Sequence, residues 1–268
     1  MKNIESKIFE KVDMNKTYEK AKNLLQEEEI KLDDFTDLYG EENIKKDKKY
    51  VEEMEKKFIQ QSSPECVQAK ELATILEAII YDQTELSNWF GETAVTIKTS
   101  RYDDIVNKAD IITEFQESAF AIDATLSSDI EKKFNCIKKE IEKNKLSRIK
   151  YFISDRMNIR EELRKIPRFI IGVDCKIVKE LSELWINREN KALEKHPIQF
   201  LILKEIILQC EAFKNFAEKI NQPEIAAIYE KSQRVIEKIY NDKKISEIEE
   251  TESYDNVLQV IKMNLKNF

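Results

Sequence analysis

The chain has 268 residues, which is enough for one large domain or for a core with appended helices. Charged residues make up 36% of the sequence, whereas glycine occurs three times and proline four times, so long helices are favoured over a loop-rich all-β fold. The 45 Lys and Arg residues against 52 Asp and Glu residues give a net charge of -7, which argues against a chain-wide surface for polyanions.

Several classes of protein are excluded by features that the sequence lacks. No apolar run approaches the roughly 18 residues that a membrane helix needs, and the first residues hold no hydrophobic segment for export. We therefore expect a soluble, cytoplasmic protein without a membrane partner. The cysteines are scattered without CxxC spacing, which favours reduced thiols over disulfides or a zinc site. They are Cys66, Cys136, Cys175 and Cys210.

Histidine and glycine are too scarce for several kinds of catalytic or cofactor site. His196 is the only histidine, so schemes that need two are excluded, and its place before Pro197 indicates a residue at a helix entry. The glycines at positions 40, 91 and 172 are too far apart for a P-loop or a GxGxxG turn. No nucleotide or organic cofactor is expected.

The first 63 residues predict helices with heavily charged faces and few apolar positions. We expect residues 1–63 to form a helical arm that packs on the main body or on a partner protein. Ser62-Ser63-Pro64 marks the boundary with an α/β core over residues 64–190. Residues 191–268 are expected to form a helical region packed on that core.

A helix over residues 68–86 opens the predicted core. Its apolar residues are spaced for one helical face, and Glu77 lies at the edge of that stripe. The small neighbour Ala73 leaves room beside Glu77 for another group. Two interpretations stay open here: Glu77 points to solvent, or it faces a functional site.

Three short strands follow close together, over residues 93–99, 110–113 and 120–126. Ser100 has capping-box spacing and predicts a helical turn between the first strand and the second. The link between the second and third strands is short enough for a hairpin. These three strands are therefore expected to be neighbours in one sheet.

The third strand carries an aspartate in its middle. Side chains alternate across a strand, so Asp123 and Thr125 share one face, while Phe120 and Ile122 lie on the other. A buried aspartate is costly unless something pairs with it. Asp123 therefore predicts either a cation site or a carboxylate that is bonded to backbone or to a lysine.

The second half of the predicted core alternates helix and strand. A helix over residues 129–144 precedes a strand over 148–154, and a second strand over 168–173 is apolar enough to be buried on both faces. The strands that flank the 129–144 helix need a crossover, which is normally right-handed and parallel. We expect a mixed central sheet of about five strands flanked by helices, followed by long helices from Pro197 onward.

This order resembles the αβββαβ core of the PD-(D/E)XK nuclease-like superfamily, which has a restriction-endonuclease-like fold. The matching residues are Glu77 on the first helix, Asp110 at the head of the second strand and Asp123 on the third. Thr125 stands where the pattern has its lysine. The resemblance covers about residues 68–175, and the wider sequence also resembles a family of uncharacterised bacterial proteins, which implies no activity.

The resemblance implies a Mg²⁺ site with Asp110, Asp123 and Glu77 as metal-binding and catalytic residues. Carboxylates from different elements hold Mg²⁺ in such nucleases, and the metal lowers the pKa of an attacking water and neutralises charge on the phosphate. Glu114 is a spare ligand, since it shares a strand face with Asp110. The implied activity is that of a magnesium-dependent phosphodiesterase acting on DNA or RNA.

The missing lysine bears directly on catalysis. One such contact to the transition state is worth roughly 10²- to 10³-fold in rate, so Thr125 leaves open that the protein is inactive. In some members of the superfamily a lysine reaches in from the next helix, and Lys132 and Lys133 occupy its first turns. We assign the catalytic role to Lys132. Lys98 and Lys150, on flanking strands, are further candidates.

One segment is strongly basic in an acidic chain. Residues 132–168 hold 13 Lys and Arg against 5 Asp and Glu, a local excess of eight positive charges. Such a patch could bind nucleic acid in a salt-dependent way, or its side chains could pair with acids from elsewhere in the fold. The expected nucleic-acid-binding residues are Lys133, Arg156, Arg160, Arg164 and Arg168.

Two alternatives to a nuclease remain. The first is a nucleic-acid-binding module that keeps the nuclease-like core without catalysis and uses the basic segment. The second is an interaction scaffold whose helical arms bind protein partners, with the central acids serving only the structure.

Overall fold

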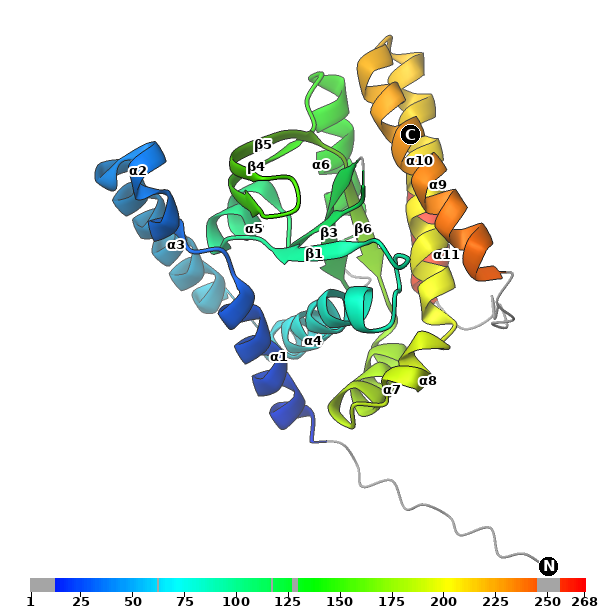
Figure 1. Cartoon of the computed structure of the whole chain (residues 1–268), viewed down its shortest axis with the longest axis horizontal. Helices are drawn as coiled ribbons and strands as arrows, with labels where there is room; N and C mark the ends of the chain where they lie inside the picture. Colours follow the sequence, from blue (N-terminus) through cyan, green and yellow to red (C-terminus); the bar gives the residue numbers. More distant parts are fainter. Residues whose placement is uncertain (1–12, 62, 117, 127–129, 245–255) are drawn as a thin grey trace, which may run out of the picture.

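The computed structural model describes residues 13–61, 63–116, 118–126, 130–244 and 256–268. A four-stranded mixed sheet lies at its centre, with the strand order β1-β2-β3-β6 (Figure 1). The first two pairs are antiparallel and the third pair, β3 with β6, is parallel. The strands are β1 (Val95–Lys98), β2 (Ile111–Glu114), β3 (Ala119–Thr125) and β6 (Arg168–Gly172). The predicted mixed α/β architecture is therefore confirmed.

A separate hairpin corrects the prediction of a single five-stranded sheet. It joins β4 (Ser147–Ser154) to β5 (Ile159–Ile166) in a two-stranded antiparallel sheet, so the strand predicted over 148–154 does not pair with β3. Ile149 and Phe152 of the hairpin pack against Ile112 and Ala121 on one face of the central sheet. No strand was predicted over residues 159–166, where charged residues break any apolar run.

The two faces of β3 have different neighbours, as the alternation of its residues predicts. Phe120, Ile122 and Ala124 belong to the main apolar core, whereas Ala121 contacts the β4-β5 hairpin. Asp123 lies on the same side of the strand as Ala121. Strand β6 is buried along its whole length, as expected for a strand covered on both faces.

Helices α4 to α8 form the middle of the chain around the sheet. Helix α4 buries the apolar stripe predicted from its sequence, and α6 buries the four apolar residues expected on its inner face. Ser63 Oγ accepts a hydrogen bond from the Cys66 N–H at the start of α4, across 3.3 Å. Ser100 caps α5 in the same way, as its spacing predicts. The helices are α4 (Pro64–Leu86), α5 (Arg101–Asn107), α6 (Ile130–Glu142), α7 (Cys175–Ile186) and α8 (Asn190–Glu194).

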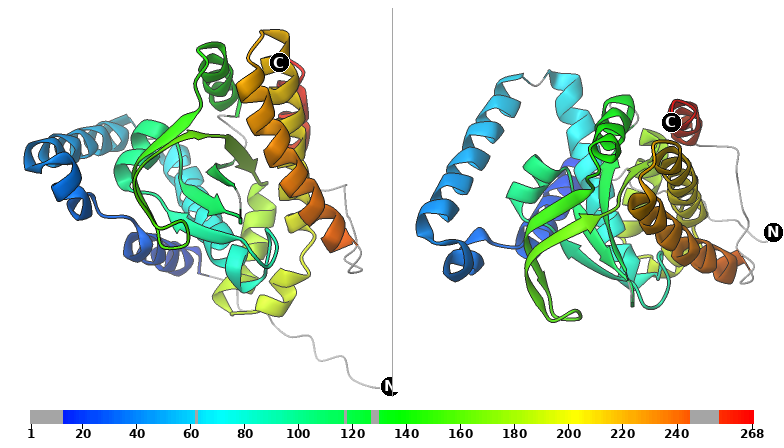
Figure 2. Two further views of the ribbon diagram at one scale, coloured as in Figure 1. Left: turned by 45° about the horizontal axis from the view of Figure 1, so that its top comes forward. Right: turned by 90° about the horizontal axis from the view of Figure 1, so that it is seen from above.

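The N-terminal helices contact the core at several places. Ala21 and Leu25 of the first helix belong to the main apolar core, where that helix packs along α4. Phe35 packs against Tyr151 of β4 with ring centroids 5.2 Å apart. Figure 2 shows α2 and α3 reaching outward on the side opposite α9 and α10. The elements are α1 (Met14–Glu28), the 3-10 helix η1 (Leu32–Phe35), α2 (Thr36–Tyr39) and α3 (Glu41–Gln61).

The C-terminal helices cover the free edge of β6. Gln209 Nε2 donates to Ile170 O across 2.7 Å, and Gln209 Oε1 accepts from Ile170 N–H across 2.9 Å. Glu205 Oε2 accepts from Gly172 N–H across 3.1 Å, so side chains take the place of a further strand. These helices are α9 (Ile198–Lys219), α10 (Pro223–Lys244) and α11 (Asn256–Leu265).

None of the described helices combines the length and the apolar character that are needed to cross a membrane. The predicted strand link at Glu117, the start of the helix predicted from residue 129 and the charged segment 245–255 lie outside the described residues.

Candidate functional site

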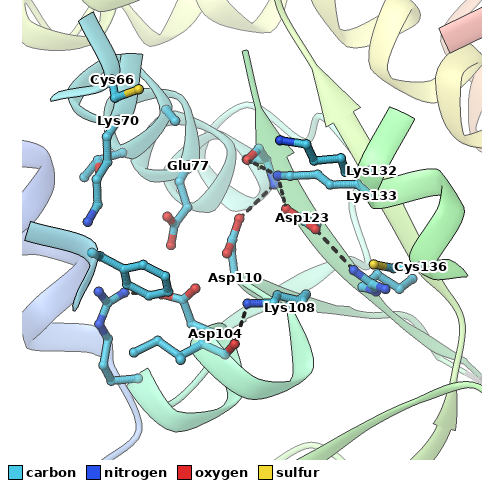
Figure 3. A pocket seen from close by; sticks show the side chains of 17 residues that line it. Cys66, Lys70, Glu77, Asp104, Lys108, Asp110, Asp123, Lys132, Lys133 and Cys136 are labelled. Carbon is cyan, nitrogen blue, oxygen red and sulfur yellow. Dashed lines mark hydrogen bonds and ion pairs between the residues drawn. The ribbon is translucent and has the colours of Figure 1, made fainter. Parts of the chain in front are cut away.

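A cavity of about 760 Å³ opens between α4, α5 and α6, at the ends of β2 and β3 (Figure 3). The three carboxylates predicted to bind metal, Glu77, Asp110 and Asp123, all line it. Lys132 and Lys133 of α6 line it too. The structure therefore brings the predicted acids and the predicted replacement lysines to one place, although they are up to 56 positions apart in the sequence.

Asp123 is held by two cations from opposite sides. Its Oδ2 accepts a hydrogen bond from Arg168 Nη1 on β6 across 3.2 Å. Its Oδ1 forms an ion pair with Lys133 Nζ, which also donates to Ala124 O across 3.4 Å. The buried Asp123 carboxylate is therefore paired, as predicted, and its partners are an arginine and a lysine.

Asp110 is fixed by the backbone of strand β3. Its own N–H donates to Ile122 O across 2.9 Å, and its Oδ2 accepts from the Ala124 N–H across 2.8 Å. Burial raises the pKa of Asp110 well above its usual range, and the negative charges of Glu77, Asp104 and Asp123 raise it further.

Glu77 faces the sheet rather than solvent, which settles the question left open by its position on the helix. Its Oε1 forms an ion pair with Lys98 Nζ of β1 across 2.7 Å. Lys98 Nζ also donates to Asp110 O across 2.9 Å, so one lysine links two of the predicted ligand segments. Burial raises the pKa of the Glu77 carboxyl, against the opposing charge of Lys98.

For Lys98 the neighbouring charges together have a larger effect on the pKa than burial has. Burial lowers the pKa of Lys98, but the charges of Glu77, Asp104 and Asp110 outweigh burial and raise it overall. The side chain is only 6% exposed, so the ammonium remains charged inside the protein because carboxylates surround it.

Asp104 is a fourth acid of the site that the sequence did not indicate. It lies on α5, forms an ion pair with Arg101 Nη1 and is hydrogen-bonded to Asp110. Burial alone would raise its pKa, but the charges of Lys98 and Arg101 hold the pKa below its usual value. Its neighbour Asp103 completes the capping-box pattern that begins at Ser100, accepts from the Lys150 and Tyr151 N–H groups and is structural. No local pattern marks Asp104.

The first two lysines of α6 differ in what they contact. Sequence reasoning gave the catalytic role to Lys132, whereas Lys133 is the one that reaches Asp123. Lys132 lines the same cavity. Thr125, which stands in the lysine position of the nuclease pattern, is buried on β3 outside the cavity lining.

Other predicted site residues lie elsewhere. Glu114 is buried at the far end of β2, where its Oε2 accepts from Ser154 Oγ across 2.9 Å. Arg160 pairs with Asp37, and Arg164 pairs with Glu162. Arg156 donates to the Thr93 carbonyl. Of the five residues expected to bind nucleic acid, only Lys133 and Arg168 line the cavity.

The donor set is suited to a hard cation. Carboxylate oxygens and backbone carbonyls such as that of Ala124 are ligands that Mg²⁺ prefers. The Lys133 ammonium contacts two such oxygens, Asp123 Oδ1 and Ala124 O. Among the residues that the structure describes, however, no three His, Cys, Asp or Glu side chains form a group ready to hold a metal. Lys98 and Lys133 neutralise the acids instead.

Comparison of the chain with protein-family models, with curated proteins and with solved structures finds no match.

Proposed function

We propose that this protein is a Mg²⁺-dependent phosphodiesterase that hydrolyses nucleic acid. The observation that carries the proposal is the shared cavity, where Glu77 of α4, Asp110 before β2 and Asp123 of β3 meet two lysines of α6. Buried acids that raise one another's pKa are unfavourable for stability alone, and such clusters are typical of functional sites.

The connections between the strands agree with the resemblance noted in the sequence. Strands β1, β2 and β3 are antiparallel neighbours, and the chain then passes through α6 and the β4-β5 hairpin before β6 pairs in parallel with β3. This is the order expected of an αβββαβ core with the hairpin inserted before its last strand. It supports the nuclease-like assignment of the three acids.

The residues of the cavity have distinct roles in this proposal. Asp110, Asp123 and the Ala124 carbonyl would hold Mg²⁺, with Glu77 facing them from α4. When bound, the metal supplies a polarised phosphate and a water of lowered pKa. Arg168 keeps Asp123 in place, and Lys132 and Lys133 supply positive charge for the phosphate of the substrate.

The test is a cleavage assay with end-labelled single-stranded DNA, duplex DNA and RNA, in Mg²⁺, in Mn²⁺ and in excess chelator. The wild-type protein should cleave at least one substrate only with metal. Asp123→Asn and Asp110→Asn should each lower the rate by roughly 10²-fold or more. Asp242→Asn, at an exposed position of α10 outside the cavity, is the matched control and should cleave normally.

Two results would reject the proposal. One is cleavage that survives Asp123→Asn at the wild-type rate, which would point to a contaminant. The other is no cleavage of any of the three substrates by folded wild-type protein in either metal.

A second candidate is suggested by the charge of the cavity, which is lined by more cations than acids. The acids number four and the cations six, namely Lys70, Arg101, Lys108, Lys132, Lys133 and Arg168. This excess would let the cavity bind a phosphate-containing ligand without metal or hydrolysis. Binding of labelled nucleic acid in chelator, weakened by salt and unaccompanied by cleavage in Mg²⁺, would favour this candidate.

A further inference from the structure

The proposed ligand segments, at Glu77, Asp110 and Asp123, are contacted by three cations that differ in how firmly they are held. Arg168 is 1% exposed and makes side-chain contacts to Asp123, Glu140 and Ser147. Lys98 is 6% exposed and contacts both Glu77 and the Asp110 carbonyl. Both are enclosed by the fold and have several partners.

Lys133 is held less firmly than Arg168 and Lys98. Its side chain is 24% exposed, and it reaches from the first turn of α6 to the edge of the cavity. Its partners are Asp123 Oδ1 and Ala124 O, two oxygens on consecutive residues of β3. A lysine stem is flexible and its ammonium is strongly hydrated, so Lys133 can leave at a lower cost than Arg168 or Lys98.

The two oxygens of Asp123 are divided between these cations. Arg168 holds Oδ2 and Lys133 holds Oδ1. If Lys133 withdraws, Asp123 stays anchored by Arg168 and keeps its orientation. Oδ1 and the Ala124 carbonyl then face the cavity without a cation, beside Asp110, whose Oδ2 accepts from the Ala124 N–H.

We infer that the Lys133 ammonium competes with a divalent metal ion for Asp123 Oδ1 and Ala124 O. In the metal-free protein Lys133 therefore neutralises the Asp123 carboxylate. This inference rests on the proposed metal site and adds that Lys133 regulates how readily a metal ion occupies it. Lys133 remains in the cavity wall after exchange, where its charge is available to a phosphate.

The experiment measures metal affinity rather than cleavage. Binding of Mn²⁺ to the full-length protein without nucleic acid is followed by electron paramagnetic resonance of the free ion. Lys133→Met should bind Mn²⁺ about tenfold or more tightly than the wild type, because the competing cation is gone. Lys133→Arg retains a competing positive charge and should bind no more tightly than the wild type.

Lys132→Met is the matched control, because it removes one positive charge from the same cavity and the same helix turn. Its affinity should change by no more than about threefold, the effect of general electrostatics. Circular dichroism confirms that each variant is folded. If Lys133→Met is unfolded, Lys133→Gln takes its place, since it also removes the charge and retains polarity.

The outcomes separate the inference from the proposed function. Tighter binding in Lys133→Met but not in Lys132→Met supports the inference, whether or not the wild type binds measurably. Equal or weaker binding in Lys133→Met, with binding abolished by Asp123→Asn, overturns the inference and leaves the metal site standing. If neither the wild type nor Lys133→Met binds Mn²⁺, both the inference and the proposed function are overturned.

Discussion

Arg168 and Asp123 lie on adjacent parallel strands, and Arg168 Nη1 donates to Asp123 Oδ2 across 3.2 Å. In the register of the sheet Arg168 is opposite Ala121, so the pair is diagonal on one face. The same guanidinium donates to Glu140 Oε1 across 2.9 Å and to Ser147 Oγ across 3.2 Å. It therefore joins β3, β4, β6 and α6 beside the cavity.

Replacing Arg168 with methionine should be strongly destabilising. The change leaves the Asp123 carboxylate buried without its inner partner, and breaking a buried pair in this way costs about 3–5 kcal/mol of unfolding free energy. Urea denaturation followed by circular dichroism measures the loss. Arg164→Met is the control, because Arg164 is 74% exposed and pairs with Glu162, so its loss should leave the unfolding free energy nearly unchanged. Similar values for the two variants would contradict the structural role of Arg168.

The ion pair between Lys98 and Glu77 can be tested by removing the lysine alone and then both side chains. Lys98→Met leaves Glu77 buried without its cation and should lower the unfolding free energy by about 3–5 kcal/mol. Adding Glu77→Met removes the stranded charge, and the double variant should be more stable than Lys98→Met alone. Denaturant midpoints of the wild type, both single variants and the double variant provide the cycle. A double variant no more stable than Lys98→Met would mean that the two side chains do not interact as the structure shows.

Asp110→Asn should separate stability from activity. Asparagine keeps an oxygen to accept from the Ala124 N–H and cannot ionise, so no further negative charge can form beside Glu77, Asp104 and Asp123, whose charges raise the pKa of Asp110. We expect the unfolding free energy at neutral pH to rise by roughly 1 kcal/mol, while metal-dependent cleavage is lost. Thermal denaturation and the cleavage assay measure the two effects. Asp242→Asn should change neither, and a marked loss of stability in Asp110→Asn would contradict the prediction.

His196 should make stability depend on pH below neutrality. Its Nδ1 accepts from the Ile198 N–H across 3.1 Å, which requires an unprotonated nitrogen. Burial lowers the pKa of the imidazole below 6.5, against the opposing effect of Glu180. The unfolded chain therefore binds a proton more readily, so stability is complete above pH 6.5 and is lost as the pH falls toward the folded-state pKa.

The variant His196→Asn tests this contribution, because asparagine can accept from the same N–H and does not titrate. The wild type should lose up to about 1 kcal/mol relative to His196→Asn between neutral and mildly acidic pH. Urea denaturation at several pH values gives the two curves. Parallel curves would show that His196 carries no such effect.

Local sequence patterns alone were enough to predict the buried faces of strand β3 and of helices α4 and α6, and the start of one helix. The alternation along β3 predicted which residues meet the main core and placed Asp123 on the other side, since a strand has a period of two. The spacing of apolar residues in α4 and α6 predicted their buried faces, because a helix has a period of 3.6. Ser100 was expected to begin a helix and does so. Each of these features depends on neighbours within a few residues.

Contacts between distant segments were decided only by the tertiary structure. Strand β5 was missed because it has no apolar run and is ordered by pairing with β4. Asp104 looks like any acid of a helical turn until α5 packs beside Asp110. The sequence placed Lys132 and Lys133 near Asp123 and led us to assign the catalytic role to Lys132, whereas Lys133 is the one that contacts the carboxylate. The orientation of α6 against β3 determines which ammonium reaches it.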